Sequence, residues 1–106
     1  MNRRLKVGIV GCGAIGSSLA RAVLKDFFAM AEVAALYDRD EAKSRSLAKS
    51  LSRKKHLAVG TLKQLIKKSD LVLECSSSLA SFGIAQETLR QGRAIMIMSV
   101  GGVAGK

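Results

Sequence analysis

Three glycines near the start of the chain are spaced as a phosphate-binding turn requires. They form the pattern G-x-G-x-x-G directly after an apolar segment over residues 5–10, and a helical periodicity begins among them. Glycine lets the backbone turn sharply and lets a pyrophosphate come close, while the first amides of a helix supply donors at a positive dipole end. The alternative is a glycine-rich turn of an α/β protein that binds no ligand. The residues predicted to contact a dinucleotide here are Gly11, Gly13, Ala14, Ile15 and Gly16.

An aspartate follows the next apolar segment, at the position where dinucleotide-binding turns require an acid. Asp38 comes about 20 residues after the last of the three glycines. A carboxylate there can accept both hydroxyls of the adenosine ribose, and it repels a 2′-phosphate, which favours NAD over NADP. The neighbouring Arg39 can stack on the adenine or pair with a 2′-phosphate, so we expect NAD to be preferred and NADP to be tolerated. The alternative role of Asp38 is to cap the following helix, and the two roles can coexist.

Short polar residues follow two later apolar segments. If the strand order reverses between the first and fourth strands, the turns after the fourth and fifth strands border the crevice in which doubly wound sheets bind ligands. Side chains and amides there can hydrogen-bond the ribose on the nicotinamide side, and ordinary loop chemistry is the alternative. The residues predicted to lie at this side are Cys75, Ser76, Ser99, Gly101 and Gly102.

Apolar segments and helical periodicities alternate along the whole chain. The predicted strands cover residues 5–10, 32–37, 57–59, 71–75 and 94–98. The predicted helices begin near residues 14, 42, 61 and 81, and the last of them ends at residue 91. Such alternation is typical of a parallel sheet with helices on both faces, and right-handed crossovers leave few topologies. We therefore predict one α/β domain over residues 1–106, a Rossmann-type doubly wound sheet with strand order 3-2-1-4-5.

Local signals mark the ends and the buried faces of these helices. Thr61 and Gln64 have the spacing of a capping box, and Gly92 is predicted to end the last helix. The periodicity predicts which side chains of the first and last helices face the sheet. They are Ile15, Leu19, Ala22, Val23 and Phe27 in the first helix, and Phe82, Ile84, Ala85, Thr88 and Leu89 in the last.

Composition limits the classes of partner. The chain of 106 residues has a net charge of +10, which by itself favours nucleic acid or an acidic membrane. Only 4% of the residues are aromatic, so no base-stacking surface is indicated and we expect no nucleic-acid partner. No apolar run approaches a membrane-spanning length. Cys12 and Cys75 are the only cysteines and make no disulfide framework, so we expect a cytoplasmic protein.

Four segments of the chain resemble the N-terminal domain of L-aspartate dehydrogenases, within the wider group of homoserine dehydrogenase-like NAD-binding domains. The segments are VGIVGCGAIG at residues 7–16, ALYDRD at 35–40, DLVLE at 70–74 and MSVG at 98–101. The resemblance implies an NAD(P)-dependent oxidoreductase that interconverts L-aspartate and iminoaspartate. It also implies cofactor contacts at the glycine turn, at Asp38 and over residues 99–102. The sequence departs from the family at Cys75, Ser76, Ser77 and Gly102, which concerns the nicotinamide side more than the pyrophosphate site.

The resemblance also implies a part of the enzyme that these residues do not contain. Aspartate dehydrogenases continue into a second α/β domain that carries the catalytic histidine, the substrate contacts and much of the dimer interface. The sequence offers no catalytic constellation and no metal site of its own. We therefore expect a chain that binds NAD but is inactive alone, with a catalytic domain or second subunit as partner and with a homo-oligomer as its assembly. The alternative is a stand-alone NAD-binding module that regulates or senses.

Overall fold

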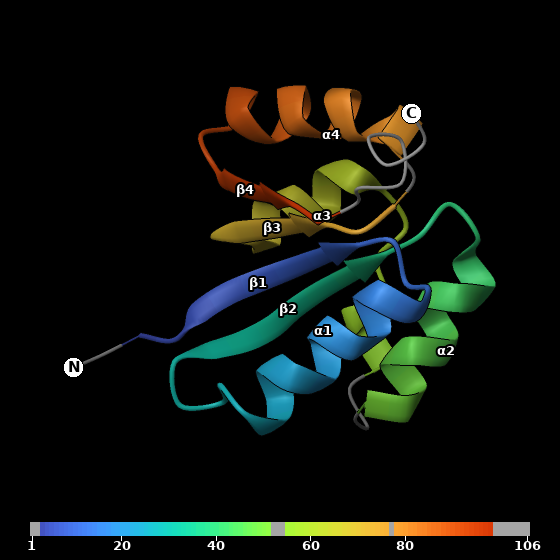
Figure 1. Cartoon of the computed structure of the whole chain (residues 1–106), viewed down its shortest axis with the longest axis vertical. Helices are drawn as coiled ribbons and strands as arrows, with labels where there is room; N and C mark the ends of the chain where they lie inside the picture. The colour runs from blue at the N-terminus through green and yellow to red at the C-terminus, as the bar shows by residue number, and fades with distance from the viewer. Residues whose placement is uncertain (1–2, 52–54, 77, 99–106) are drawn as a thin grey trace.

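A four-stranded parallel sheet lies at the centre of the computed structural model, which describes residues 3–51, 55–76 and 78–98. The strands are β1 (Leu5–Val10), β2 (Ala31–Tyr37), β3 (Leu71–Glu74) and β4 (Ala94–Ile97), in the spatial order β2-β1-β3-β4. The helices are α1 (Ala14–Lys25), α2 (Glu41–Leu51), the short 3₁₀ helix η1 (Lys55–Leu57), α3 (Leu62–Lys68) and α4 (Ser78–Arg90). Figure 1 shows α1 and α2 on one face of the sheet and α3 and α4 on the other. The predicted doubly wound α/β fold is therefore confirmed.

The predicted third strand is reduced to a single bridge. Residue 57 belongs to η1, and only Ala58 pairs with Leu36 of β2, in the parallel sense. The amide of Val59 donates to the carbonyl oxygen of Leu36 at 2.9 Å, and then the cap of α3 begins at Thr61. Too few residues remain between η1 and this cap to build a ladder. Because the bridge lies beside β2, the predicted order 3-2-1-4-5 holds with its first member shortened to one residue pair.

The core has two apolar clusters, one on each face of the sheet. Successive side chains of a strand point to opposite faces, so β1 supplies Val7 and Ile9 to one cluster and Val10 to the other. The first cluster is completed mainly by α1, α2 and η1, and the second by α3 and α4. Each fully buried aliphatic side chain contributes about 1.5–3 kcal/mol. Strands that are apolar on both faces are therefore held between two helical layers, and their carboxyl ends share one edge.

The predicted helix signals are confirmed where they are local. The amide of Gln64 donates to the Thr61 hydroxyl at 3.1 Å, and the amide of Thr61 donates to the Gln64 side chain at 3.2 Å, which is the capping box. Gly92 follows α4 with φ of +74°, a conformation that favours glycine at the end of a helix. Over residues 3–51, 55–76 and 78–98, no helix combines the length and the apolar character needed to cross a bilayer.

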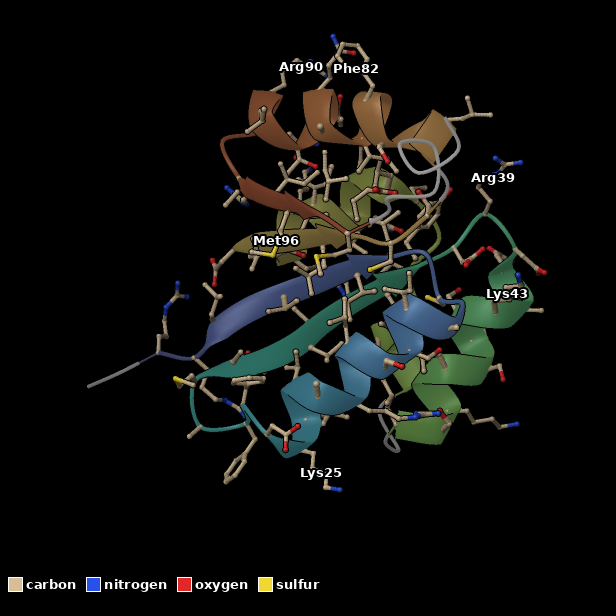
Figure 2. The ribbon with its side chains drawn as sticks, viewed as in Figure 1. Lys25, Arg39, Lys43, Phe82, Arg90 and Met96 are labelled. Atoms are coloured by element: carbon tan, nitrogen blue, oxygen red, sulfur yellow. The ribbon has the colours of Figure 1, made fainter. Side chains whose placement is uncertain are left out.

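Four of the side chains predicted to face the sheet do not. Ile15 and Phe27 are 48% and 47% exposed, because Ile15 lies in the first turn of α1 and Phe27 lies beyond its end at Lys25. On α4 it is Ile84 and Thr88 that are buried. The other two, Phe82 and Leu89, are 72% and 62% exposed, and Figure 2 shows Phe82 pointing away from the sheet. α4 is apolar on both sides, and the periodicity alone could not decide which side faces the sheet.

Candidate functional site

A hollow of about 420 Å³ lies at the carboxyl ends of the strands, where the order of the sheet reverses between β1 and β3. Ligands of open α/β sheets bind at this position, because the chain leaves the two strands in opposite directions and opens a crevice between them. The residues that line it come from the ends of β1, β2 and β3 and from the starts of α2 and α4. They are Val10, Gly11, Gly13, Tyr37, Asp38, Arg39, Asp40, Lys43, Cys75, Ser76, Ala80 and Ile84.

The three glycines of the turn between β1 and α1 differ in the space that an added side chain would find. Gly11 has φ of +95°, and an added Cβ would lie 2.7 Å from the backbone of Cys75 and of Ser76. At Gly16 an added Cβ would collide with the carbonyl oxygen of Gly11, so that only glycine lets α1 pack against the turn. Gly13 differs, because an added Cβ would have no protein atom within 4 Å. Two glycines therefore serve the packing of the protein, and the third leaves space open at the crevice.

Gly13 is also the N-cap of α1, and its lack of a side chain leaves the first turn of the helix uncapped by its own residue. The amides of Ala14 and Ile15 belong to this first turn, and both residues are exposed. The unpaired amides of a first helical turn attract an anion, since they combine donors with the positive end of the helix dipole. The fit of a pyrophosphate to this place thus rests on an open space and on donors beside it.

The carboxylate of Asp38 is held in place by two backbone amides. One oxygen accepts the N–H of Cys12 at 2.7 Å, and the other accepts the N–H of Asp40 at 2.8 Å. Each carboxylate oxygen has a second lone pair, so this half-buried group can accept further hydrogen bonds from a ligand in the hollow. Asp38 does not cap α2. Asp40 does, because its side chain accepts the amide of Ala42 at 3.1 Å.

Two cations lie beside Asp38, and one of them was missed from the sequence. Arg39, which was predicted, and Lys43, which was not, are both exposed and line the same hollow. Figure 2 shows them beyond the end of β2, on the loop and on the start of α2. Lys43 could have been found from its place in the first turn of the helix that follows Asp38, since that turn lies beside the strand end. The β2 side of the hollow therefore carries both signs of charge.

The β3 side of the hollow is built around a buried carboxylate that sequence reasoning also missed. Glu74 ends β3 and is 0% exposed. One oxygen accepts the amide of Ser76 at 2.8 Å and also its hydroxyl, and the other accepts the hydroxyl of Ser81 at 2.7 Å. The amide of Cys75 donates to the carbonyl oxygen of Val10 at 2.7 Å. Cys75 and Ser76 therefore lie at the crevice end of β3, against the glycine turn. In the sequence, the signal for Glu74 was a carboxylate at the end of an otherwise apolar strand.

The two cysteines are free thiols with low reactivity. Burial raises the pKa of Cys12 to about 12, with further contributions from Asp38 and Cys75. Burial also raises the pKa of Cys75 to about 11, and Glu74 adds to this shift. Thiols react as thiolates, so these raised pKa values leave both groups mostly protonated and slow to react near neutral pH. Within the described part of the chain, no three His, Cys, Asp or Glu side chains are grouped to hold a metal ion.

The structure brings together six of the twelve predicted cofactor contacts in the lining of the hollow: Gly11, Gly13, Asp38, Arg39, Cys75 and Ser76. Ala14, Ile15 and Gly16 lie next to it, in the first turn of α1. The remaining three, Ser99, Gly101 and Gly102, lie outside the described residues. No ligand contact is tested by this arrangement, so the roles of all twelve stay predictions.

Comparison with known sequences gives a consistent set of relatives. A family model described as "Homoserine dehydrogenase, NAD binding domain" matches residues 11–106. The chain is 40% identical over 101 residues to the L-aspartate dehydrogenase of Methanocella arvoryzae, covering 95% of this chain and 36% of that protein. It is 38% identical over 103 residues to the L-aspartate dehydrogenase of Methanocaldococcus jannaschii, covering 96% and 38%. The chain thus spans well under half the length of these relatives.

Solved structures of low sequence identity share the fold. GenD2 from gentamicin A biosynthesis, solved in complex with NAD, matches with a TM-score of 0.78 at 23% identity, over 92% of this chain and 27% of that one. The myo-inositol dehydrogenase from Lactobacillus casei, solved with NAD(H) and myo-inositol, also matches with a TM-score of 0.78, at 22% identity, over 90% of this chain and 28% of that one. In both cases the match is to a minor part of a longer chain.

Proposed function

This chain belongs to the family of homoserine dehydrogenase NAD-binding domains, and we propose that it holds the cofactor for an oxidoreductase of the L-aspartate dehydrogenase type. Binding of NAD is the property that this family of domains shares. The conversion of L-aspartate to iminoaspartate is proposed for the complete enzyme, because this chain covers only 36% to 38% of the relatives that bear that name. When bound, NAD supplies the hydride acceptor, and the residues of this chain bind and orient it.

One observation supports the assignment of the site. The N-terminus of α1, whose first turn is open, lies beside the carboxylate of Asp38, which two backbone amides hold in place. We assign the pyrophosphate to the first turn of α1, where Gly13 leaves space and Ala14 and Ile15 offer amides. We assign the adenosine ribose to the free lone pairs of Asp38. The nicotinamide half then extends toward Cys75 and, as the sequence predicts, toward residues 99–102.

The charges of the β2 side support a preference among cofactors. Asp38 repels the 2′-phosphate of NADP, whereas Arg39 and Lys43, on the same side of the hollow, attract it. Because Asp38 is the more buried group and is fixed by two amides, we propose that NAD binds more tightly and that NADP still binds.

We propose that hydride transfer needs a substrate-binding part of the same oxidoreductase, supplied as a further domain or as a second subunit. Exposed apolar side chains on two neighbouring elements support this, since a docked part would remove them from water. On α4 they are Leu79, Phe82 and Leu89, and on β4 they are Met96 and Ile97. These exposed side chains favour a docked part over a stand-alone sensing module, and they suit a homo-oligomer of the complete enzyme. Two free thiols support a reducing, cytoplasmic location.

Titration calorimetry of the full chain with NAD and with NADP tests this proposal. We expect NAD to bind and Asp38→Ala to weaken it about tenfold, because two charge-assisted hydrogen bonds to the ribose are lost. The matched control is Asp26→Ala, which removes an exposed carboxylate at the other end of α1 and leaves the affinity unchanged. Absence of binding of either dinucleotide would overturn the proposed function. Unchanged NAD affinity in Asp38→Ala would overturn only the ribose assignment.

A further inference from the structure

Glu74 is the one carboxylate of the described residues that is completely buried, and it lies directly beneath the β3 side of the crevice. Its partners among the described residues lie on two separate elements. The amide and the hydroxyl of Ser76, on the turn after β3, donate to one oxygen, and the hydroxyl of Ser81, on α4, donates to the other. A buried charge is stable only when its oxygens are hydrogen-bonded in this way. The carboxylate therefore ties the turn to the helix.

Both tied elements form the wall of the hollow. Ser76 lines it from the turn, and Ala80, the neighbour of Ser81, lines it from α4, together with Ile84 one turn later. Figure 1 shows α4 lying over β3 and β4. The opposite side of the turn is fixed as well, because the backbone of Cys75 and Ser76 leaves no room for a Cβ at Gly11. The turn is thus held between the glycine on one side and Glu74 on the other.

This arrangement also decides what Ser76 can offer to a ligand. A serine hydroxyl has one hydrogen and two lone pairs, and here the hydrogen is donated to Glu74, as is the hydrogen of the Ser76 amide. What remains at the side-chain oxygen is a capacity to accept. The hydroxyl groups of a ribose are donors that fit such an oxygen, whereas a phosphate, which carries only acceptors at neutral pH, does not.

We propose that Glu74 is a positioning residue for the nicotinamide-side half of the crevice, where it presents the Ser76 oxygen as an acceptor for a ribose hydroxyl. This inference rests on the proposed function, which assigns the adenosine ribose to Asp38 and the pyrophosphate to α1. Those two assignments leave the second ribose of NAD on the β3 side. Glu74 itself is buried beneath the wall and acts through Ser76 and α4.

The test compares two ligands that share one half. ADP carries only the adenosine ribose and the two phosphates, whereas NAD adds the second ribose and the nicotinamide. Calorimetric titrations of the full chain with each ligand are made for the wild type, Glu74→Ala, Glu74→Gln and Thr88→Val. The Thr88 variant is the matched control, because Thr88 is equally buried on α4 but its hydroxyl donates to Ile84 within the helix.

We expect Glu74→Ala to weaken NAD about tenfold and to leave ADP within about twofold. Glu74→Gln restores NAD affinity to within about threefold of wild type, since its amide oxygen can accept from Ser76 while its NH₂ group donates to Ser81. Thr88→Val changes neither ligand. A loss of general stability would lower both affinities together, so the ratio of NAD to ADP affinity separates positioning from folding. Equal losses for the two ligands, or no loss for NAD, would overturn the proposal.

A second readout does not depend on any ligand. Amide hydrogen exchange of the unliganded chain is expected to be faster at Ser76 in Glu74→Ala, while the amide of Cys12, which donates to Asp38, keeps its wild-type rate. If the wild type bound neither nucleotide, the proposed function would fail. The exchange rate of the Ser76 amide would still show whether Glu74 positions the turn. An unchanged rate in Glu74→Ala would overturn that role.

Discussion

Two carboxylates end strands on either side of the glycine turn, and the protein uses them in opposite ways. Asp38 follows β2, is half-buried, and accepts one backbone amide at each oxygen, so that lone pairs remain open to the hollow. Glu74 ends β3, is completely buried, and has its oxygens directed to Ser76 and Ser81. Under the proposed function, the same chemical group thus serves a ligand where water can reach it and serves the scaffold where water cannot. Burial, rather than residue type, separates a binding carboxylate from a structural one.

The glycines of the turn also divide into one that serves the packing of the protein, Gly11, and one that leaves space open at the crevice, Gly13. Replacing Gly11 gives the largest effect on stability that we expect. Gly11→Ala forces a positive φ on alanine and places its Cβ 2.7 Å from the backbone of Cys75 and Ser76. We expect the free energy of unfolding to fall by about 3 kcal/mol, measured by urea denaturation. Gly13→Ala is the matched control, because its backbone is extended and its Cβ would contact nothing.

Gly13→Ala is expected to lower the free energy of unfolding by no more than about 1 kcal/mol, since it loses only a better N-cap residue. Its cost appears in NAD affinity instead, because the added methyl group occupies space assigned to the pyrophosphate. Equal destabilisation by the two alanines would show that the turn does not divide into a packing glycine and a ligand glycine.

The carboxylates themselves give the next largest difference. Glu74→Ala removes a completely buried carboxylate that accepts the amide and hydroxyl of the half-buried Ser76 and the hydroxyl of the buried Ser81, and we expect a loss of about 2 kcal/mol in the free energy of unfolding. Asp38→Ala frees two amides at a half-buried position that water can reach, so we expect a loss of about 1 kcal/mol. Denaturation curves at one pH measure both. A larger loss at Asp38 would reverse the comparison.

The smallest effect that we expect is on the alkylation rates of the two cysteines, each of which lies near one of the two carboxylates. Besides burial, Asp38 raises the pKa of Cys12 and Glu74 raises the pKa of Cys75. Asp38→Asn should therefore increase the alkylation rate of Cys12, and Glu74→Gln that of Cys75, each by about two- to threefold at pH 8. Mass spectrometry after iodoacetamide treatment resolves the two sites. A change in both cysteines in either variant would mean that general opening, not local charge, controls the thiols.

The same two thiols determine whether the stability of the folded chain rises or falls at alkaline pH. Folding raises their pKa values from 9.0 to about 12 and about 11, so the folded chain holds these protons more tightly than the unfolded chain. Their contribution to stability is full below pH 9 and is lost as the pH rises toward the folded values. Stability should therefore fall in the alkaline range, and Cys12→Ala should reduce that fall.

Local signals predicted much of this molecule. The first strand, the glycine turn and the capping box of Thr61 and Gln64 depend on residues within one turn of each other, and all three are present. The site residues that were missed depend on contacts between distant segments. Lys43 lines the crevice because α2 begins beside the end of β2, and Glu74 supports the wall of the crevice because α4 brings Ser81 over β3. The sequence offers a hint for each, the place of Lys43 just after Asp38 and a carboxylate at the end of an apolar strand, but the contacts themselves depend on how distant segments pack.

The wrong predictions have the same origin. Phe82 and Leu89 fit a helical stripe as well as Ile84 and Thr88 do, and only the packing of α4 on the sheet separates them. A cap by Asp38 was left open as an alternative because this residue follows the strand, whereas α2 begins three residues later and is capped by Asp40. Sequence reasoning located the acidic cluster, but the choice between its members depended on the exact start of α2.

The outer strand of the sheet has a consequence for how this chain behaves in solution. Among the described residues, β4 has a partner strand on one side only, and its side chains Met96 and Ile97 are half exposed. A free apolar strand edge is a template for pairing with another copy. Mutual repulsion of chains with a charge of +10 opposes that encounter at low ionic strength. Salt weakens the repulsion over the Debye length without weakening the apolar contact, so dilute buffers should keep isolated chains apart and concentrated salt should drive them to self-associate.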